Sequence, residues 1–266
     1  MHTQKLKGPI AELGLKKKSL LFAELAALAY SEKTEATKEA KKLGFTTVEY
    51  YNIGGAQAYR FMNKIDFVIA CRGTEPTQFN DIKADLNAIP TKSETVSYVH
   101  SGFKEEVDKI WPRLVDDISR EAGTRTVWFC GHSLGAAMAT IVASRCTGSK
   151  DCPDPAELYT YGSPRVGFKK YVRSEPITHY RWQNNNDIVT RVPMWIMGYR
   201  HDGERMYLNA WGNVRKMSSW QRLKDKWRGL WLGIKKGQID SFSDHSMTNY
   251  ISYINTWAEG KENPQK

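Results

Sequence analysis

Cysteine is scarce in this sequence, and its spacing argues against two kinds of site. The four cysteines include no Cys-x-x-Cys pair, the spacing that zinc sites and thioredoxin-type redox sites use, so we expect no metal. Cys71 and Cys130 each end an apolar run and are predicted to be buried. Cys146 and Cys152 flank a polar loop. They could form a disulfide only in an oxidising compartment, and we expect them to be reduced.

Long apolar runs are also missing. No stretch approaches the ~20 residues of a membrane span. Lys16–Lys18 and the apolar run over residues 19–30 have the composition of a secretory signal peptide, but Glu24 interrupts that run, which begins well inside the chain. We therefore expect an amphipathic helix here. A cytoplasmic or peripheral membrane location is favoured over secretion.

Acidic residues are fewer than basic ones, which gives a formal net charge of +10. The excess lies in two segments. Residues 1–20 contain five lysines and one glutamate, and residues 199–240 contain ten basic and four acidic residues, so the rest of the chain is neutral. This distribution argues against a nucleic-acid binder. It favours local contact with an anionic membrane or lipid-droplet surface.

Strand-like and helix-like segments alternate along the chain. Apolar patterns predict strands over residues 46–53, 58–62, 65–71, 127–130, 157–161 and 178–182. Helical spacing predicts helices over residues 19–30, 100–122, 136–145 and 247–257. Such alternation predicts an α/β fold with a mostly parallel sheet between helices. Without an internal repeat or a linker, residues 1–266 are expected to form one domain, with a basic, tryptophan-rich insertion at about 199–240.

The pattern with the clearest chemistry is Gly131-His132-Ser133-Leu134-Gly135, which lies between a predicted strand and a helix rich in small residues. A serine on such a turn projects its hydroxyl above the sheet edge, and a Cβ at Gly131 or Gly135 would collide with the neighbouring strand or helix. The N–H groups at the helix start could stabilise an oxyanion. An ordinary tight turn is the alternative, but we interpret Ser133 as a nucleophile.

A nucleophilic serine needs a base and an orienting carboxylate, in the chain order Ser, Asp or Glu, His for α/β-hydrolases. Asp187 follows a predicted strand in a turn-rich stretch, where the alternative role is an Asx-turn or a helix cap. His245 and His201 both lie in polar turns downstream. Their positions leave the choice of base open, with a preference for His245.

Several ordered blocks of residues resemble the class 3 lipase family, which contains fungal triacylglycerol lipases and feruloyl esterases. The blocks are Cys71-Arg72-Gly73-Thr74, Asp81 to Leu86, His100-Ser101-Gly102-Phe103, the Gly131–Gly135 motif, Tyr161 to Gly167, Asn186 to Pro193, and Asp244-His245 with Tyr250. The resemblance implies an α/β-hydrolase fold, with Ser133 as nucleophile, Asp187 as acid and His245 as base. It also implies an oxyanion hole formed by Thr74 and Leu134, with Asp85 steadying the Thr74 loop.

Two features depart from the family pattern. Ile82 replaces a common tryptophan, and few large apolar residues follow Thr74. Phe79, Ile82 and Leu86 have the spacing of one short helical face. This segment could be a lid or a plain surface loop, and the departures argue against a strongly hydrophobic lid.

The basic segment contains Trp220, Trp227 and Trp231 at helical spacing among lysines and arginines. Such a helix either contacts an anionic lipid surface or packs its apolar face on the protein body. The resemblance implies a serine ester hydrolase without a cofactor, acting on acylglycerols. Phospholipase A1, feruloyl or aryl esterase, and a catalytically idle membrane-binding module are the alternatives. The substrate is expected to be a lipid or another ester, and the oligomeric state stays open.

Overall fold

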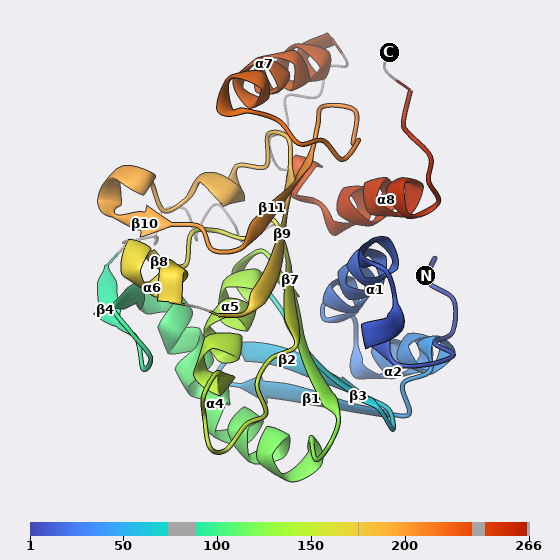
Figure 1. Cartoon of the computed structure of the whole chain (residues 1–266), viewed down its shortest axis with the longest axis vertical. Helices are drawn as coiled ribbons and strands as arrows, with labels where there is room; N and C mark the ends of the chain where they lie inside the picture. Colours follow the sequence, from blue (N-terminus) through green and yellow to red (C-terminus); the bar gives the residue numbers. More distant parts are fainter. Residues whose placement is uncertain (74–88, 175, 236–242, 265–266) are drawn as a thin grey trace.

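The structure, a computed structural model, describes residues 1–73, 89–174, 176–235 and 243–264, except for the side chains of residues 230–235. Its centre is a seven-stranded sheet (Figure 1). In spatial order the strands are β1 (Thr47–Ile53), β2 (Ala56–Met62), β3 (Asp66–Cys71), β6 (Thr126–His132), β7 (Glu157–Tyr161), β9 (Thr178–Asn184) and β11 (Glu204–Leu208). From β3 to β11 all neighbours are parallel, whereas β1, β2 and β3 pair antiparallel. The predicted mostly parallel sheet is therefore confirmed.

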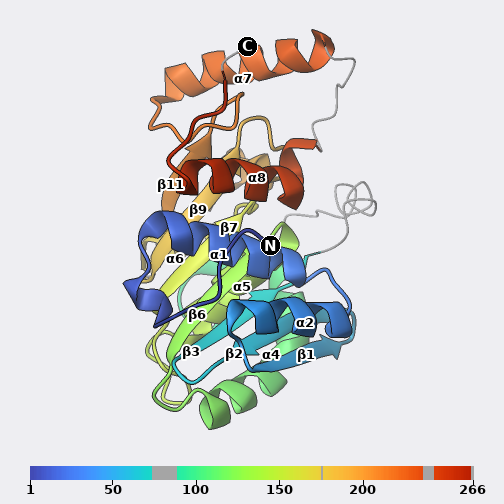
Figure 2. The ribbon, with the colours of Figure 1, turned by 90° about the vertical axis from the view of Figure 1, so that its right-hand side faces the viewer.

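One face of this sheet is covered by three helices, α1 (Leu15–Leu28), α2 (Lys33–Leu43) and α8 (Met247–Ala258), which Figure 2 shows in front of the strands. Alternation along β3 divides the core, because Val68 and Ala70 pack on this face whereas Phe67 and Ile69 pack on the other. A preceding short 3-10 turn, Ile10–Glu12, places the buried Ile10 in the same cluster.

Helix α1 was expected to be amphipathic, and this is wrong. Every residue from Ser19 to Ala26 is buried, including Glu24 at 1% exposure. The N-terminal segment covers the side that would otherwise face water, and the backbone N–H groups of His2 and Thr3 donate to the Glu24 carboxylate. A buried carboxylate with hydrogen-bond partners is tolerated there.

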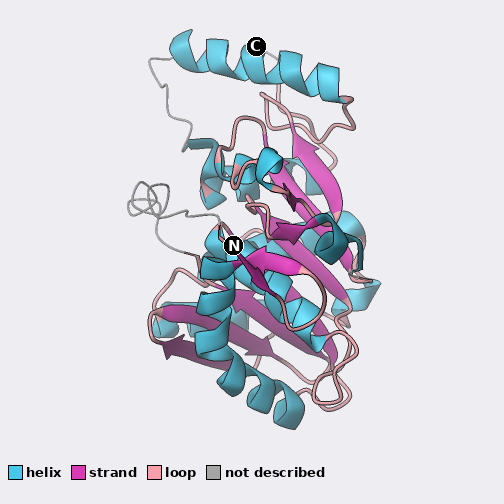
Figure 3. Cartoon of the chain, turned by 90° about the vertical axis from the view of Figure 1, so that its left-hand side faces the viewer, coloured by secondary structure: helices cyan, strands magenta, loops and turns pink. Residues whose placement is uncertain are grey.

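The opposite face carries α4 (Ser101–Glu121), α5 (Leu134–Cys146) and α6 (Lys169–Ser174), and Figure 3 views the molecule from the side opposite to Figure 2. A second, antiparallel sheet has the order β10 (Tyr199–Arg200), β8 (Gly167–Phe168), β5 (Tyr98–His100), β4 (Pro90–Lys92).

All four cysteines are free thiols and buried, as expected for Cys71 and Cys130.

Helix α7 (Ser219–Lys235) lies at one end of the molecule, at the top of all three views. Two 3-10 turns, Val189–Arg191 and Trp195–Met197, precede it, and a third, Ser243–His245, leads into α8. Among the described residues, no helix combines the length and the apolar character that crossing a bilayer would require.

Candidate active site

Ser133 occupies the strained turn between β6 and α5. Its backbone has φ 59° and ψ −131°, a conformation that costs free energy in a residue with a side chain and is typical of functional sites. The turn is tight because a Cβ at Gly135 would lie 2.2 Å from the Cys71 carbonyl oxygen, and one at Gly131 would lie 2.3 Å from the Gly135 oxygen. Both glycines are therefore required by the approach of α5 to β3 and β6. Leu134, half-buried, is the first residue of α5, where N–H groups lack partners within the helix.

His245 and Asp187 form a buried hydrogen-bonded pair. The His245 Nδ1 lies 3.0 Å from each Asp187 carboxylate oxygen. Asp187 is fully buried and His245 is 2% exposed. Asp187 follows the carboxyl end of β9, and His245 ends the turn before α8. The other candidate base, His201, instead places its Nε2 2.8 Å from the Thr190 carbonyl oxygen.

Tyr250 holds the carboxylate of Asp187 from α8. Its hydroxyl donates to Asp187 Oδ2 at 2.7 Å and accepts the Asn184 N–H at 2.9 Å. The Val189 N–H donates to the other oxygen, Oδ1, at 3.0 Å. Burial and the neighbouring carboxylate raise the pKa of Tyr250 well above its usual value, so its hydroxyl stays protonated and continues to donate.

His132, inside the Gly131–Gly135 motif, supports His245 through its backbone. Its Nε2 lies 2.7 Å from the His245 carbonyl oxygen, and its Nδ1 lies 3.0 Å from the Tyr30 hydroxyl. Because a carbonyl only accepts, Nε2 carries the proton and Nδ1 accepts from Tyr30. Burial, and secondly the nearby His245, lower the pKa of His132 well below its usual value, so the ring is neutral.

Gly162 links the nucleophile to the acid–base pair. The Ser133 N–H donates to the carbonyl of Tyr161 at 3.0 Å, and the next residue, Gly162, has φ +60°. A Cβ on Gly162 would lie 2.7 Å from His245 Nδ1 and 2.8 Å from Asp187 Oδ2. The backbone at the end of β7 therefore lies against the His245–Asp187 pair at Gly162, and it is hydrogen-bonded to Ser133 at Tyr161.

The structure thus places Ser133 at the carboxyl end of β6 and the hydrogen-bonded Asp187–His245 pair after β9, with the Tyr161–Gly162 backbone at the end of β7 next to both. This is the edge at which α/β sheets carry their sites. The Ser133 hydroxyl is buried and, within the described part of the chain, accepts and donates no hydrogen bond. Sequence reasoning gave no role to His132 or Gly162 and quoted Tyr250 only as part of a block. The available signal for Gly162 was a glycine directly after a predicted strand, because glycine readily adopts the left-handed backbone that the structure shows there.

Other predicted site residues lie outside the described residues. They are Thr74, Phe79, Ile82, Asp85 and Leu86, together with the side chain of Trp231. Among the residues that are described, no group of three or more histidine, cysteine or carboxylate side chains is arranged to hold a metal.

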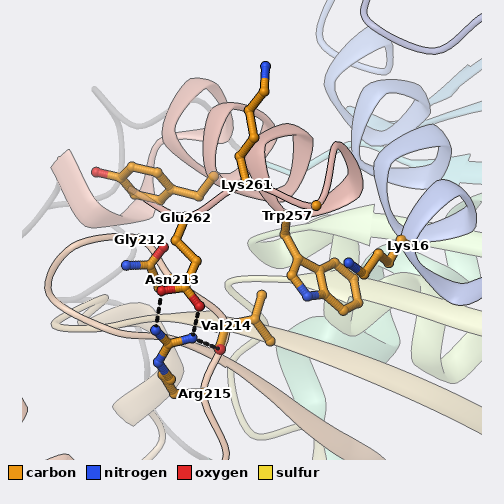
Figure 4. Close-up of a pocket in the computed structure, with 10 residues that line it drawn as sticks. Lys16, Gly212, Asn213, Val214, Arg215, Trp257, Lys261 and Glu262 are labelled. Carbon is orange, nitrogen blue, oxygen red and sulfur yellow. Dashed lines mark hydrogen bonds and ion pairs between the residues drawn. The ribbon is translucent and has the colours of Figure 1, made fainter. Parts of the chain in front are cut away.

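A separate pocket opens where α1, α8 and the loop after β11 meet (Figure 4). Its lining contains none of the predicted site residues. Arg215 in its wall is paired with Glu262 at 2.7 Å, and the Lys16 ammonium lies over the Trp257 ring at 5.2 Å from its centroid. The charge of Arg215 in this pocket is therefore already matched by Glu262.

A family model, several curated relatives and several solved structures that resemble this chain are described as lipases. The family model for lipase (class 3) matches residues 68–197. The "Secreted mono- and diacylglycerol lipase 1" of Fusarium solani is 37% identical over 118 residues, which cover 42% of this chain and 34% of that protein. "Phospholipase A1-II 1" of Oryza sativa is 37% identical over 216 residues, covering 66% of this chain and 52% of that protein. The chain thus spans between a third and a half of the length of these relatives.

Solved structures match the fold over a larger share of the chain. The Rhizomucor miehei triacylglyceride lipase aligns with a TM-score of 0.63 at 22% identity, covering 74% of this chain and 81% of that one. Lipase II from Rhizopus niveus aligns with a TM-score of 0.63 at 21% identity, covering 73% and 80%. The fold is therefore of the α/β-hydrolase type. With the match of the family model to residues 68–197, these findings support the class 3 lipase family as the family of this chain.

Proposed function

We propose that the protein is a serine ester hydrolase that cleaves acylglycerol lipids. The observation that carries this proposal is the strained Ser133 at the strand–helix turn beside the buried His245–Asp187 pair. Mono- and diacylglycerol lipases among the relatives support the choice of substrate.

The geometry fits acyl transfer to water. Ser133 attacks the ester carbonyl while His245 takes the hydroxyl proton, and Asp187 stabilises the imidazolium that forms. The Leu134 N–H at the start of α5 would donate to the oxyanion, with Thr74 as the second donor. Loss of one such donor typically costs about 3 kcal/mol in transition-state stabilisation. His245 then protonates the leaving alcohol, and water hydrolyses the acyl-enzyme.

The same proposal includes contact with an anionic lipid surface through α7. Trp220 and Trp227 are 64% and 66% exposed, and Leu223 between them is also exposed. Asp225 on the other side of the helix is buried, and its Oδ2 accepts from the Tyr207 hydroxyl at 3.0 Å. The alternative, in which the tryptophans pack on the body, does not fit these two residues. An outward apolar stripe on a basic helix is typical of interfacial binding.

Hydrolysis of p-nitrophenyl esters from acetate to palmitate, with Ser133→Ala in parallel, tests the activity. We expect the wild type to prefer medium or long chains and the variant to lose at least about a thousandfold in kcat. Equal, negligible rates for both proteins on soluble and emulsified esters would refute the hydrolase and favour a catalytically idle membrane-binding module.

Rice phospholipase A1-II 1 supports a second candidate, phospholipase A1, on the same triad. Release of fatty acid from phosphatidylcholine and from diacylglycerol, measured in the same mixed micelles, separates the two activities.

A further inference from the structure

Six basic side chains gather beside the proposed acid residue, on the side of α7 opposite its exposed tryptophans. We call them the cationic cluster: Arg165, Arg181, Arg191, Arg205, Arg222 and Lys226. Its base is formed by two strands, because Arg181 of β9 lies directly across from Arg205 of β11 in the parallel register. Like charges at facing positions destabilise a sheet, so this pair calls for an explanation.

Hydrogen bonds tie the cluster to the loop that carries Asp187. The Asn186 amide donates to the Lys226 carbonyl at 3.0 Å and accepts from Arg191 at 2.9 Å. Arg165 donates to the carbonyl oxygens of Arg191 and Pro193. Three members of the cluster, Lys226 of α7, Arg191 of the loop after β9 and Arg165 of the segment after β7, are therefore hydrogen-bonded to the loop that carries Asp187.

The charge of Arg181, at the base of the cluster, is buried and poorly matched. Arg181 is 4% exposed. Its Nε donates to the backbone oxygen of Asp202 at 3.1 Å, but its Nη1 has no acceptor anywhere in the described ranges. The Asp202 carboxylate lies 2.9 Å from His179 Nδ1 instead. Burying a guanidinium with an unmatched nitrogen is costly unless a ligand completes it.

The ionisation of the cluster reflects this crowding. Burial, and then the guanidinium groups of Arg191, Arg222, Arg205 and Arg165, lower the pKa of Lys226 to about 8. Burial and Arg205 lower the pKa of Arg181 to about 9. A bound anion would reverse the repulsive part of both shifts, because opposite charge favours the protonated form.

We propose that the cationic cluster binds a phosphate group. Four guanidinium groups lie near enough to the Lys226 ammonium to lower its pKa, and guanidinium forks beside an ammonium suit a tetrahedral, multiply charged anion better than a single carboxylate. The cluster differs in this respect from the pocket of Figure 4, where Glu262 already occupies Arg215. Two sources can supply the phosphate. One is the headgroup of a phospholipid substrate, an assignment that rests on the proposed function, and the other is free phosphate.

The first experiment titrates inorganic phosphate into the catalytically inactive Ser133→Ala protein by calorimetry, with sodium chloride at matched ionic strength as the reference. We expect saturable binding, weakened about tenfold or more by Lys226→Gln and by Arg205→Gln, since a charge-assisted hydrogen bond contributes about 1.5–3 kcal/mol. Lys224→Gln is the matched control, because Lys224 is exposed on α7 two residues away. It should bind like the parent.

The outcome of this titration decides the inference without reference to catalysis. Absent binding, or equal affinity in Lys226→Gln and Lys224→Gln, overturns it. Circular dichroism and thermal unfolding of each variant establish that a lost affinity is not lost folding. Arg205→Gln, at an exposed position, provides a second variant whose folding is not at risk.

A second experiment distinguishes the source of the phosphate in the active enzyme. The ratio of kcat/KM for phosphatidic acid to that for diacylglycerol is compared among wild type, Lys226→Gln and Lys224→Gln in the same micelles. A ratio that falls several-fold only in Lys226→Gln supports the lipid headgroup. If the parent protein binds inorganic phosphate but the ratio in Lys226→Gln equals that of the wild type, the headgroup assignment is overturned and free phosphate is supported. If the protein binds phosphate but hydrolyses no ester, the proposed function is refuted, whereas the proposed phosphate site is still supported.

Discussion

At the scale of single residues, Gly162 carries a role that side-chain chemistry does not reveal. We expect Gly162→Ala to lower kcat about a hundredfold, because its Cβ would displace His245 or Asp187 and misplacing a catalytic group by about 1 Å has this effect. Gly148→Ala is a matched control, since Gly148 also has a positive φ but nothing lies within 4 Å of its added Cβ. The measurement is kcat on a soluble ester. Equal rates for the two variants would contradict the prediction.

Tyr250 makes a second prediction at this scale. Tyr250→Phe removes the donor to Asp187 and leaves the buried Asn184 N–H without its acceptor. We expect lower kcat with little change in KM, and a loss of about 1–3 kcal/mol in the free energy of unfolding. Kinetics and urea unfolding measure the two effects. Tyr253→Phe on the same helix serves as the control, and an equal effect of both substitutions would argue against a role through Asp187.

The sequence identified the turn that carries the nucleophile, but it did not predict the side chains that hold His245 in place. Gly131 and Gly135 are local to Ser133 and identify the turn by spacing alone. His132 and Tyr30 meet only because α1 crosses β6, and the sequence separation of such contacts hides them. The choice between His201 and His245 was likewise undetermined by position, because it depends on which loop reaches Asp187.

At the scale of elements, α7 provides the third prediction. Trp220→Ala/Trp227→Ala should lower activity on anionic vesicles by about tenfold while sparing a soluble short-chain ester, because exposed tryptophans contribute to partition into the interface. Vesicle co-sedimentation and initial rates measure the effect. Ile53→Ala, an exposed apolar residue on β1, is the control. Equal losses on the vesicles and on the soluble ester would count against interfacial contact.

Helices and strands with a clear apolar pattern were predicted from the sequence, whereas those with a weak or very short pattern were not. The strand at 157–161 was placed at its observed bounds, since a short apolar run in a parallel sheet is buried on both sides. Helix α2 was missed because it buries only Ala36, Ala40 and Leu43, too weak an apolar pattern. The strands of the small sheet have two or three residues each, which is too short for any period.

At the scale of the whole molecule, buried neutral histidines make stability depend on pH. His100 is 3% exposed, and burial lowers its pKa from 6.5 to about 4. Burial also lowers the pKa values of His132, His179 and His201. Between pH 6.5 and 4 the unfolded chain binds protons that the folded chain does not, so stability is fully present above pH 6.5 and is lost as the pH falls through this window.

The final prediction follows from His100 alone. Its shift corresponds to about 3 kcal/mol at most, and its ring stacks on Phe103 with centroids 4.2 Å apart. His100→Phe retains an apolar ring there and removes the titrating group. We therefore expect the variant to lose less free energy of unfolding than the wild type between pH 7 and pH 4.5. Urea unfolding at both pH values measures this, with the exposed His2→Gln as the control. If the free energy of unfolding of the His100→Phe protein falls between pH 7 and pH 4.5 as much as that of the wild type, His100 is not a buried neutral histidine.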